Sequence, residues 1–189
     1  MSDATAGAPR GVQPPEPLWS AELNTCGPES TQELAARIGS SLRAGDLLLL
    51  TGELGAGKTT FTQGLGAGLG VREGIISPTF VLSRIHPSLT GGPDLVHVDA
   101  YRLSGIDELE DLDLEQGMDR SVTVIEWGAG KAEQLSDSRL EVTLTRESGS
   151  TMSGSGEPLQ LDFSESEDDE PRTITVAAFG PAWMDRRLF

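Results

Sequence analysis

The sequence is poor in the residues that bind nucleic acid or build disulfide and zinc frameworks. Fourteen Lys and Arg stand against 30 Asp and Glu, so the formal net charge is −16. A chain this acidic is not expected to bind nucleic-acid phosphates by itself. A single cysteine excludes an internal disulfide, and one cysteine with two histidines cannot supply a Cys/His structural zinc site. The only lysines are Lys58 and Lys131.

Long hydrophobic runs are also missing. No segment approaches the roughly 18 apolar residues of a membrane span, and the N-terminus has no apolar signal core. We therefore expect a cytoplasmic protein with no membrane association. With 189 residues and 37% hydrophobic content, the chain can bury one ordinary core, which predicts a single domain.

Two segments have the composition of solvated chain. Residues 1–17 hold four prolines and little to bury, which predicts a disordered leader. Residues 147–170 hold eight acids and no base in a Gly/Ser-rich context, so without them the net charge is 14 − 22 = −8. An acidic interaction tail is one interpretation, but we favour a solvated insertion loop within a hairpin. The domain is then expected over 18–180, with a C-terminal tail over 181–189.

Helical and strand periods alternate along the remaining chain. Leu34, Ile38 and Leu42 lie on one face of a helix expected over 30–43, with a capping box from Ser30 and a stop at Gly45. Four consecutive leucines over 47–50 are typical of a strand covered on both faces. We further expect a helix over 58–69, strands over 79–85, 95–99 and 122–125, a short helical region over 106–114, and a hairpin of 140–145 with 173–178. This pattern predicts an α/β domain with a mixed central sheet.

The strongest motif is Gly52-Glu-Leu-Gly-Ala-Gly-Lys-Thr59, which fits G-x-x-x-x-G-K-[ST] between a buried strand and a helix. Its glycines allow the backbone N–H groups to point at phosphate oxygens, and the helix start adds a positive dipole end. Lys58 can reach the β- and γ-phosphates, and the Thr59 hydroxyl can bind Mg²⁺. A glycine-rich turn with a chance lysine does not explain the motif in this context. The fold class is therefore a three-layer P-loop NTPase-like domain that binds a nucleoside triphosphate.

Two acids follow apolar strands. Glu126 ends the strand over 122–125, and Asp99 ends the strand over 95–99. In phosphate-loop proteins a strand-end acid holds Mg²⁺, and two such acids need distinct roles: one for the metal and one for positioning water. An exposed strand-end acid remains the alternative for Glu126. For His97, beside Asp99, we favour a satisfied structural histidine.

Five blocks occur in a characteristic order and spacing: Gly52-Glu-Leu-Gly-Ala-Gly-Lys-Thr-Thr60, Ser77-Pro-Thr-Phe80, His97-Val-Asp-Ala-Tyr-Arg-Leu103, Glu108-Leu-Glu-Asp-Leu112 and Ile125-Glu-Trp127. Together they resemble the TsaE (YjeE) family of bacterial ATPases needed for threonylcarbamoyladenosine formation in tRNA. The resemblance covers about residues 29–145 and resumes weakly at 172–180.

The resemblance implies ATP and Mg²⁺ as ligands, TsaD and TsaB as partners, and contact with tRNA only through their complex. It implies that Asp99 and Lys58 serve hydrolysis, that Thr59 and Glu126 hold magnesium, and that residues 77–80 form a switch-like loop. The implied nucleotide contacts are Gly52, Glu53, Leu54, Gly55, Ala56, Gly57, Lys58, Thr59 and Thr60, with Thr31 near the base and Trp127 beside the nucleotide or a partner. A core-edge aromatic remains the alternative for Trp127.

Other nucleotide-binding classes fit less well. A GTPase needs a base-reading motif of the Asn-Lys-x-Asp type, and neither lysine lies in one. A small-molecule P-loop kinase usually has an arginine-bearing lid over the phosphates, and no such lid is recognised in this sequence. A non-hydrolysing nucleotide-sensing subunit stays open. Gly64, Gly66 and Gly68 in the second helix each cost about 1 kcal/mol relative to alanine, so they predict either close helix packing or mobility.

Overall fold

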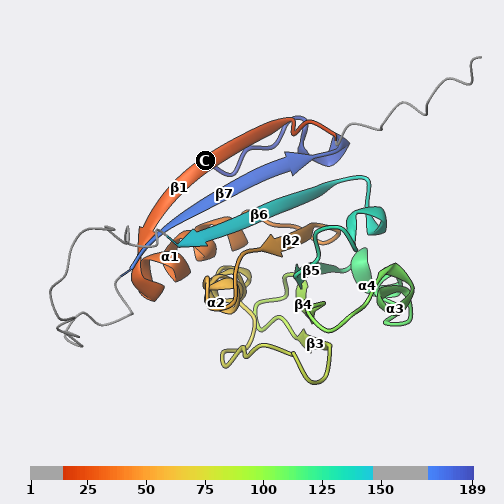
Figure 1. Ribbon diagram of the computed structural model, residues 1–189. Coiled ribbons are helices and arrows are strands. Elements are labelled where there is room, and N and C mark those ends of the chain that lie inside the picture. Colours follow the sequence, from red (N-terminus) through yellow and green to blue (C-terminus); the bar gives the residue numbers. More distant parts are fainter. Residues whose placement is uncertain (1–14, 147–169) are drawn as a thin grey trace, which may run out of the picture.

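A computed structural model describes residues 15–146 and 170–189. The strands are β1 (Trp19–Cys26), β2 (Leu47–Thr51), β3 (Ser83–His86), β4 (Asp94–Asp99), β5 (Ser121–Glu126), β6 (Arg139–Arg146) and β7 (Pro171–Phe179). The helices are α1 (Gly27–Gly39), α2 (Lys58–Leu69), α3 (Ile106–Glu110) and α4 (Glu115–Met118), with 3₁₀ turns η1 (Glu133–Leu135) and η3 (Pro181–Trp183). The strands form one mixed sheet in the order β1-β7-β6-β2-β5-β4-β3 (Figure 1).

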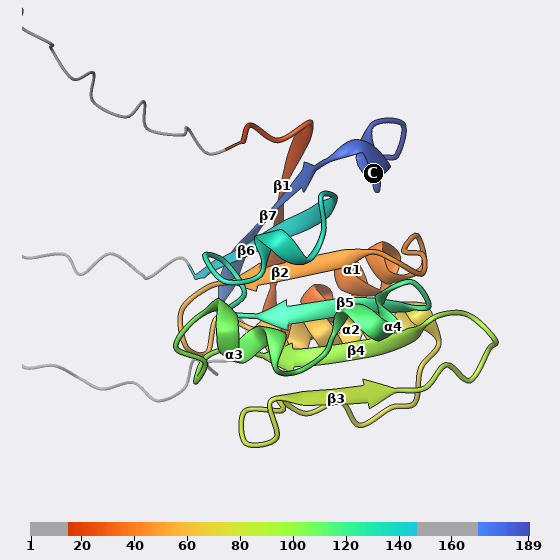
Figure 2. The same cartoon turned by 90° about the vertical axis from the view of Figure 1, so that its right-hand side faces the viewer.

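Different helices cover the two faces of the central strands (Figure 2). Leu48 and Leu50 of β2 belong to the core cluster that contains α1 and α2. Leu47 and Leu49 point the other way and pack with residues around α3 and α4. All four leucines are fully buried, and β2 pairs in parallel with both β5 and β6. The expected inner strand and the three-layer arrangement are therefore confirmed.

The register of the parallel strands brings the predicted site acids to the phosphate loop. Leu50 at the end of β2 lies opposite Glu126 of β5, and Glu126 lies opposite Asp99 of β4. The chain leaves β2 through residues 52–57 and enters α2 at Lys58, as expected. The carboxyl ends of parallel strands share one edge of a sheet, which is where α/β proteins bind ligands. The loop and both acids meet at that edge.

The glycines of α2 are explained by close packing on two sides. A Cβ at Gly64 would lie 2.4 Å from the Gln32 oxygen, and one at Gly68 would lie 2.1 Å from the Ala36 oxygen, both in the backbone of α1. A Cβ at Gly66 would lie 2.3 Å from the Ile75 side chain. Close helix packing, rather than mobility, therefore accounts for these residues.

Gly68→Ala is expected to destabilise the protein by about 1–3 kcal/mol, because overpacking against the α1 backbone outweighs the gain in helix propensity. The matched control is Gly117→Ala in α4, where an added Cβ meets nothing within 4 Å. That control should be neutral or slightly stabilising. Chemical denaturation of both variants checks the prediction. Equal stability of the two variants would show that the close approach of α1 and α2 is not a constraint.

The first helix begins earlier than predicted, and the capping box is wrong. Its N-cap is Cys26, with a proline in the first turn, and it ends at Gly39 instead of continuing to Arg43. The Ser30 hydroxyl turns back and donates to the Cys26 carbonyl oxygen over 2.6 Å. Proline at the first helical positions is favoured because its missing N–H needs no partner there. The predicted apolar face is correct, since Leu34, Ile38 and Leu42 are all buried.

Turns shorten two other predicted elements. The strand expected over 79–85 begins only at Ser83, because Val81 and Leu82 both donate to the Pro78 carbonyl and Leu82 has a φ of 65°. The helical region expected over 106–114 ends at Glu110 and is followed by a separate helix, α4. Asp113 between them has a φ of 55°, in the left-handed region that interrupts a helix.

Two segments carry structure that the sequence analysis does not predict. Strand β1 forms the edge of the sheet and pairs antiparallel with β7, which itself forms the expected hairpin with β6. In the expected tail, Trp183 is fully buried and lies edge-on to Trp19. Arg186 donates two 2.8 Å hydrogen bonds to the carboxylate of Asp46. Trp183 and Arg186 thus hold this segment against the domain, although Met184 and Phe189 are exposed. No helix in the described ranges is long and apolar enough to cross a bilayer.

Candidate functional site

A cavity of about 390 Å³ opens where the phosphate loop meets the ends of β4 and β5. Its lining consists of loop and helix-start residues, residues of the 77–80 loop, and strand-end residues: Leu54, Gly55, Gly57, Lys58, Thr59, Thr60, Ser77, Thr79, Asp99, Tyr101, Glu126 and Trp127. Most of the predicted site residues are thus brought together around one space.

Four predicted contacts do not line the cavity. Gly52, Glu53 and Ala56 belong to the loop but not to the lining. Thr31 is buried near the start of α1, where its hydroxyl donates to the Gly27 carbonyl over 2.9 Å and lies 3.0 Å from the Thr25 hydroxyl. A role for Thr31 near the base stays a prediction.

The loop presents unpaired backbone donors. Gly55 and Gly57 have φ values of 79° and 99°, which side chains rarely tolerate, and Gly57 is the N-cap of α2. No side chain in the described part of the chain caps this helix. The first N–H groups of a helix have no partner within it, so those of Lys58, Thr59 and Thr60 remain available. Such a helix start, with its positive dipole end, suits phosphate oxygens.

The ammonium of Lys58 is held at the loop by two backbone carbonyl groups and by the ring of Trp127. Its Nζ lies 2.8 Å from the Gly52 carbonyl oxygen, 2.9 Å from that of Glu53, and 3.8 Å from the centre of the Trp127 ring. Burial lowers the pKa of Lys58 below 10.5, although Glu126 and Asp99 oppose the shift. A lysine that is partly desolvated and held by neutral carbonyls gains a stronger partner when phosphate oxygens are present.

The carboxylate of Glu126 faces the start of α2. The Thr59 hydroxyl donates to Glu126 Oε1 over 3.0 Å, and His97 Nε2 lies 2.8 Å from the same oxygen. Glu126 is only 3% exposed, so it is not the exposed strand-end acid of the alternative interpretation. A hydroxyl and a carboxylate at this separation are the oxygen ligands that Mg²⁺ prefers. The residues present therefore fit a magnesium ion beside the phosphate loop.

Asp99 is tied to the loop expected to act as a switch. Ser77 and Thr79 donate to its Oδ2 over 2.9 Å and 2.6 Å, and the Tyr101 backbone N–H donates to Oδ1 over 3.0 Å. These bonds connect a buried strand-end acid with residues that also line the cavity. Movement of the 77–80 loop would therefore alter the surroundings of Asp99 directly.

Aromatic and arginine side chains complete the surroundings. Trp127 lines the cavity, has a φ of 61°, and lies 5.2 Å from the Tyr101 ring. Behind the loop, Arg146 donates to the Gly55 carbonyl oxygen. Arg172 is buried there, and its Nε has no partner within the described chain. No role is predicted from the sequence for Tyr101 or for these arginines, because they lie outside the nucleotide motif.

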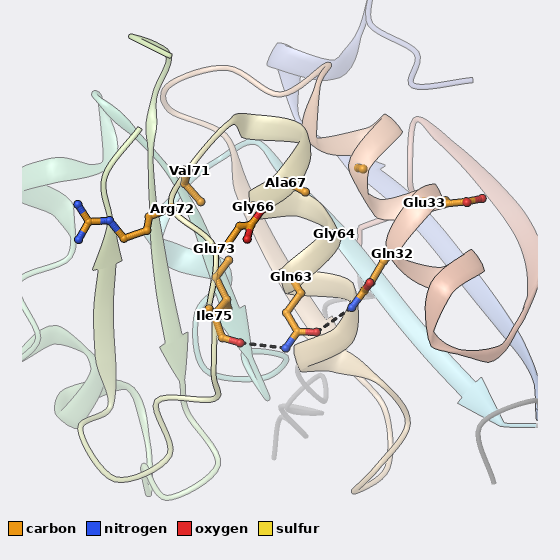
Figure 3. Close-up of a pocket in the computed structure, with 12 residues that line it drawn as sticks. Gln32, Glu33, Gln63, Gly64, Gly66, Ala67, Val71, Arg72, Glu73 and Ile75 are labelled. Carbon is orange, nitrogen blue, oxygen red and sulfur yellow. Dashed lines mark hydrogen bonds between the residues drawn. The ribbon is translucent and has the colours of Figure 1, made fainter. Parts of the chain in front are cut away.

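A second cavity of about 390 Å³ lies between α1, α2 and residues 71–75 (Figure 3). Gln63 bridges its walls, since it accepts from the Gln32 amide and donates to the Ile75 carbonyl oxygen, each over 2.9 Å. None of the predicted site residues lines this cavity. The predicted nucleotide contacts that line a cavity therefore all lie in the cavity at the phosphate loop.

Comparison with known proteins agrees with the geometry. The model of the family "Threonylcarbamoyl adenosine biosynthesis protein TsaE" matches residues 25–153. The tRNA threonylcarbamoyladenosine biosynthesis protein TsaE of Streptomyces coelicolor is 52% identical over 80% of this chain and 93% of its own length. The TsaE protein of Bacillus subtilis is 39% identical over 65% of this chain and 75% of its own length.

A solved structure supports the fold independently of the motifs. The crystal structure of Bacillus subtilis YdiB is similar with a TM-score of 0.61 and 30% sequence identity, over 86% of this chain and 87% of that one. The similarity therefore extends across the sheet and its helices and is not confined to the phosphate loop. This chain belongs to the TsaE family of threonylcarbamoyl adenosine biosynthesis proteins.

Proposed function

We propose that this protein binds ATP with Mg²⁺ and hydrolyses it as a subunit that acts with TsaB and TsaD in the threonylcarbamoyladenosine modification of tRNA. The observation that carries the proposal is that Lys58, Thr59, Asp99 and Glu126 line one cavity at the start of α2. The whole chain is acidic, with a net charge of −16, which supports contact with tRNA through the partner proteins and not through this subunit itself.

Each residue has a distinct task in this proposal. The loop N–H groups and Lys58 bind the phosphates, while Thr59 and Glu126 hold the metal. Bound Mg²⁺ would neutralise charge on the β- and γ-phosphate oxygens. Asp99 orients the attacking water, and the hydroxyls of Ser77 and Thr79 keep its carboxylate aligned. The ring of Trp127 restricts the position of the Lys58 ammonium.

The isolated protein is expected to hydrolyse ATP slowly and to be accelerated by its partners. No arginine is present in the described lining of the cavity, and an arginine acting on the transition state is worth about 10³–10⁵ in rate. The test is steady-state ATP hydrolysis by the full chain, alone and with purified TsaB and TsaD, each with and without tRNA. Asp99→Asn in the complete mixture is the control for contaminating ATPases.

The outcomes separate the alternatives. Full activity from the protein alone would contradict partner dependence. ATP binding without turnover in any mixture would favour a nucleotide-sensing subunit. Transfer of the γ-phosphate to a small molecule would favour a kinase.

A further inference from the structure

The carboxylate of Glu126 is held by a histidine outside the phosphate loop. We propose that His97 is a positioning residue, which fixes Glu126 in the orientation that faces Thr59 and magnesium. The inference rests on the proposed function and extends it to a residue that does not contact nucleotide. Its basis is the 2.8 Å separation of His97 Nε2 and Glu126 Oε1.

Strand register creates this contact. His97 in β4 lies opposite Val124 in β5, and Glu126 follows two residues later in β5. Residues two apart in a strand share a face, so both side chains point toward α2. His97 is fully buried and Glu126 is 3% exposed, so water does not compete freely for the hydrogen bond. A carboxylate oxygen only accepts, so His97 Nε2 carries the hydrogen.

The hydrogen bonds of Glu126 give His97 a particular importance. Its only donors within the described residues are Thr59 and His97, and both reach Oε1. If the Thr59 hydroxyl binds the metal through an oxygen lone pair, it can still donate its hydrogen to Glu126, but its position is then set by the metal. Of the two donors, His97 is therefore the one that restrains the carboxylate independently of the metal. Replacing a residue that hydrogen-bonds a metal ligand and orients it typically lowers metal affinity by about 10–100-fold.

The other ring nitrogen argues against a purely structural histidine. His97 Nδ1 is buried and has no hydrogen-bond partner within the described chain. Buried polar atoms are normally satisfied, because an unsatisfied one loses its hydration without gaining a hydrogen bond in return. A structural histidine is expected to have both ring nitrogens hydrogen-bonded. In His97 only Nε2, which faces Glu126, has a hydrogen-bond partner within the described chain. A ring whose single hydrogen bond goes to the predicted metal ligand is placed for that ligand.

The test compares ATP affinity in Mg²⁺ with ATP affinity in excess EDTA, by titration calorimetry on full-length variants. His97→Phe keeps the ring but removes the donor, and it should reduce the Mg²⁺-dependent gain in affinity about tenfold or more. Its affinity in EDTA should stay unchanged. His97→Gln can donate from its amide, so it should restore most of the gain. The side chain of His97→Asn is too short to bring its amide to Glu126, so this variant should behave like His97→Phe. It serves as the substitute if His97→Phe does not fold.

The matched control is His86→Phe. His86 is the other histidine, it is buried, and its ring lies 6.2 Å from that of His97 without a hydrogen bond to Glu126. It should alter thermal stability at most and leave the Mg²⁺-dependent gain intact. A full gain in folded His97→Phe or His97→Asn would overturn this inference alone. A wild-type protein that binds ATP without any Mg²⁺ effect, or does not bind it, would overturn the proposed function as well.

Discussion

Replacing Lys58 with alanine is expected to weaken ATP binding about 100-fold, since a hydrogen bond between charged groups contributes about 1.5–3 kcal/mol. The side chain ends in the cavity beside two backbone carbonyls and the Trp127 ring. Alanine removes the positive charge but leaves the glycine backbone and the helix start in place. Residual binding through the loop N–H groups should therefore survive. Titration calorimetry with ATP and Mg²⁺ measures the loss.

The matched control is Lys131→Ala, which removes the only other lysine and causes the same change in net charge. Lys131 donates to the Ala100 carbonyl oxygen over 2.7 Å and does not line the cavity. Lys131 is partly buried, but its hydrogen bond goes to a carbonyl of a residue outside the cavity lining, so its substitution should leave ATP affinity within about twofold. Equal effects of the two substitutions would mean that Lys58 has no special role at the phosphates.

Glu126→Gln is expected to uncouple Mg²⁺ from the nucleotide. The amide oxygen can still accept from Thr59 and His97, so the surrounding structure should be retained. Loss of the negative charge removes the interaction that favours the cation, and the Mg²⁺-dependent gain in ATP affinity should fall about tenfold or more. Affinity in EDTA should be unchanged or slightly higher, because a negative charge near the phosphates is gone. Calorimetry in the two buffers measures both quantities.

Asp99→Asn provides the comparison, since it makes the same chemical change on the neighbouring strand. It should lower turnover while keeping the Mg²⁺-dependent gain in affinity. If Asp99→Asn removes the Mg²⁺ effect and Glu126→Gln does not, the roles of the two acids are exchanged.

Features encoded by residues close in sequence could be predicted well. The bounds of α2 and the buried run of β2 follow from a contiguous glycine motif and four leucines, and the structure reproduces both. The acids at positions 99 and 126 were identifiable because each ends an apolar strand. Their distinct surroundings were not, because these depend on which strand is the neighbour and in which register. Only the pairing of β4 with β5 brings His97 to Glu126.

Contacts between distant segments explain the remaining differences. The edge strand β1 depends on β7, which lies more than a hundred residues away. The buried position of Trp183 depends on Trp19, and the partly buried position of Arg186 depends on Asp46. Gly64 and Gly68 of α2 are explained only by packing against α1, and Gly66 only by packing against Ile75, because each glycine appears unfavourable in an isolated helix. Local propensity is overridden at all these positions by tertiary packing.

The most direct test of the magnesium-ATP site is a crystal structure of the full chain with a non-hydrolysable ATP analogue and Mn²⁺, located by its anomalous scattering. We expect the phosphates at the loop of residues 52–60, with Lys58 on the β- and γ-phosphates. The metal should lie beside Thr59 and Glu126, with Glu126 still hydrogen-bonded to His97 and with Asp99 not coordinating the metal. Nucleotide bound elsewhere, or a metal held by Asp99 while Glu126 points away, would show that the proposed site is wrong.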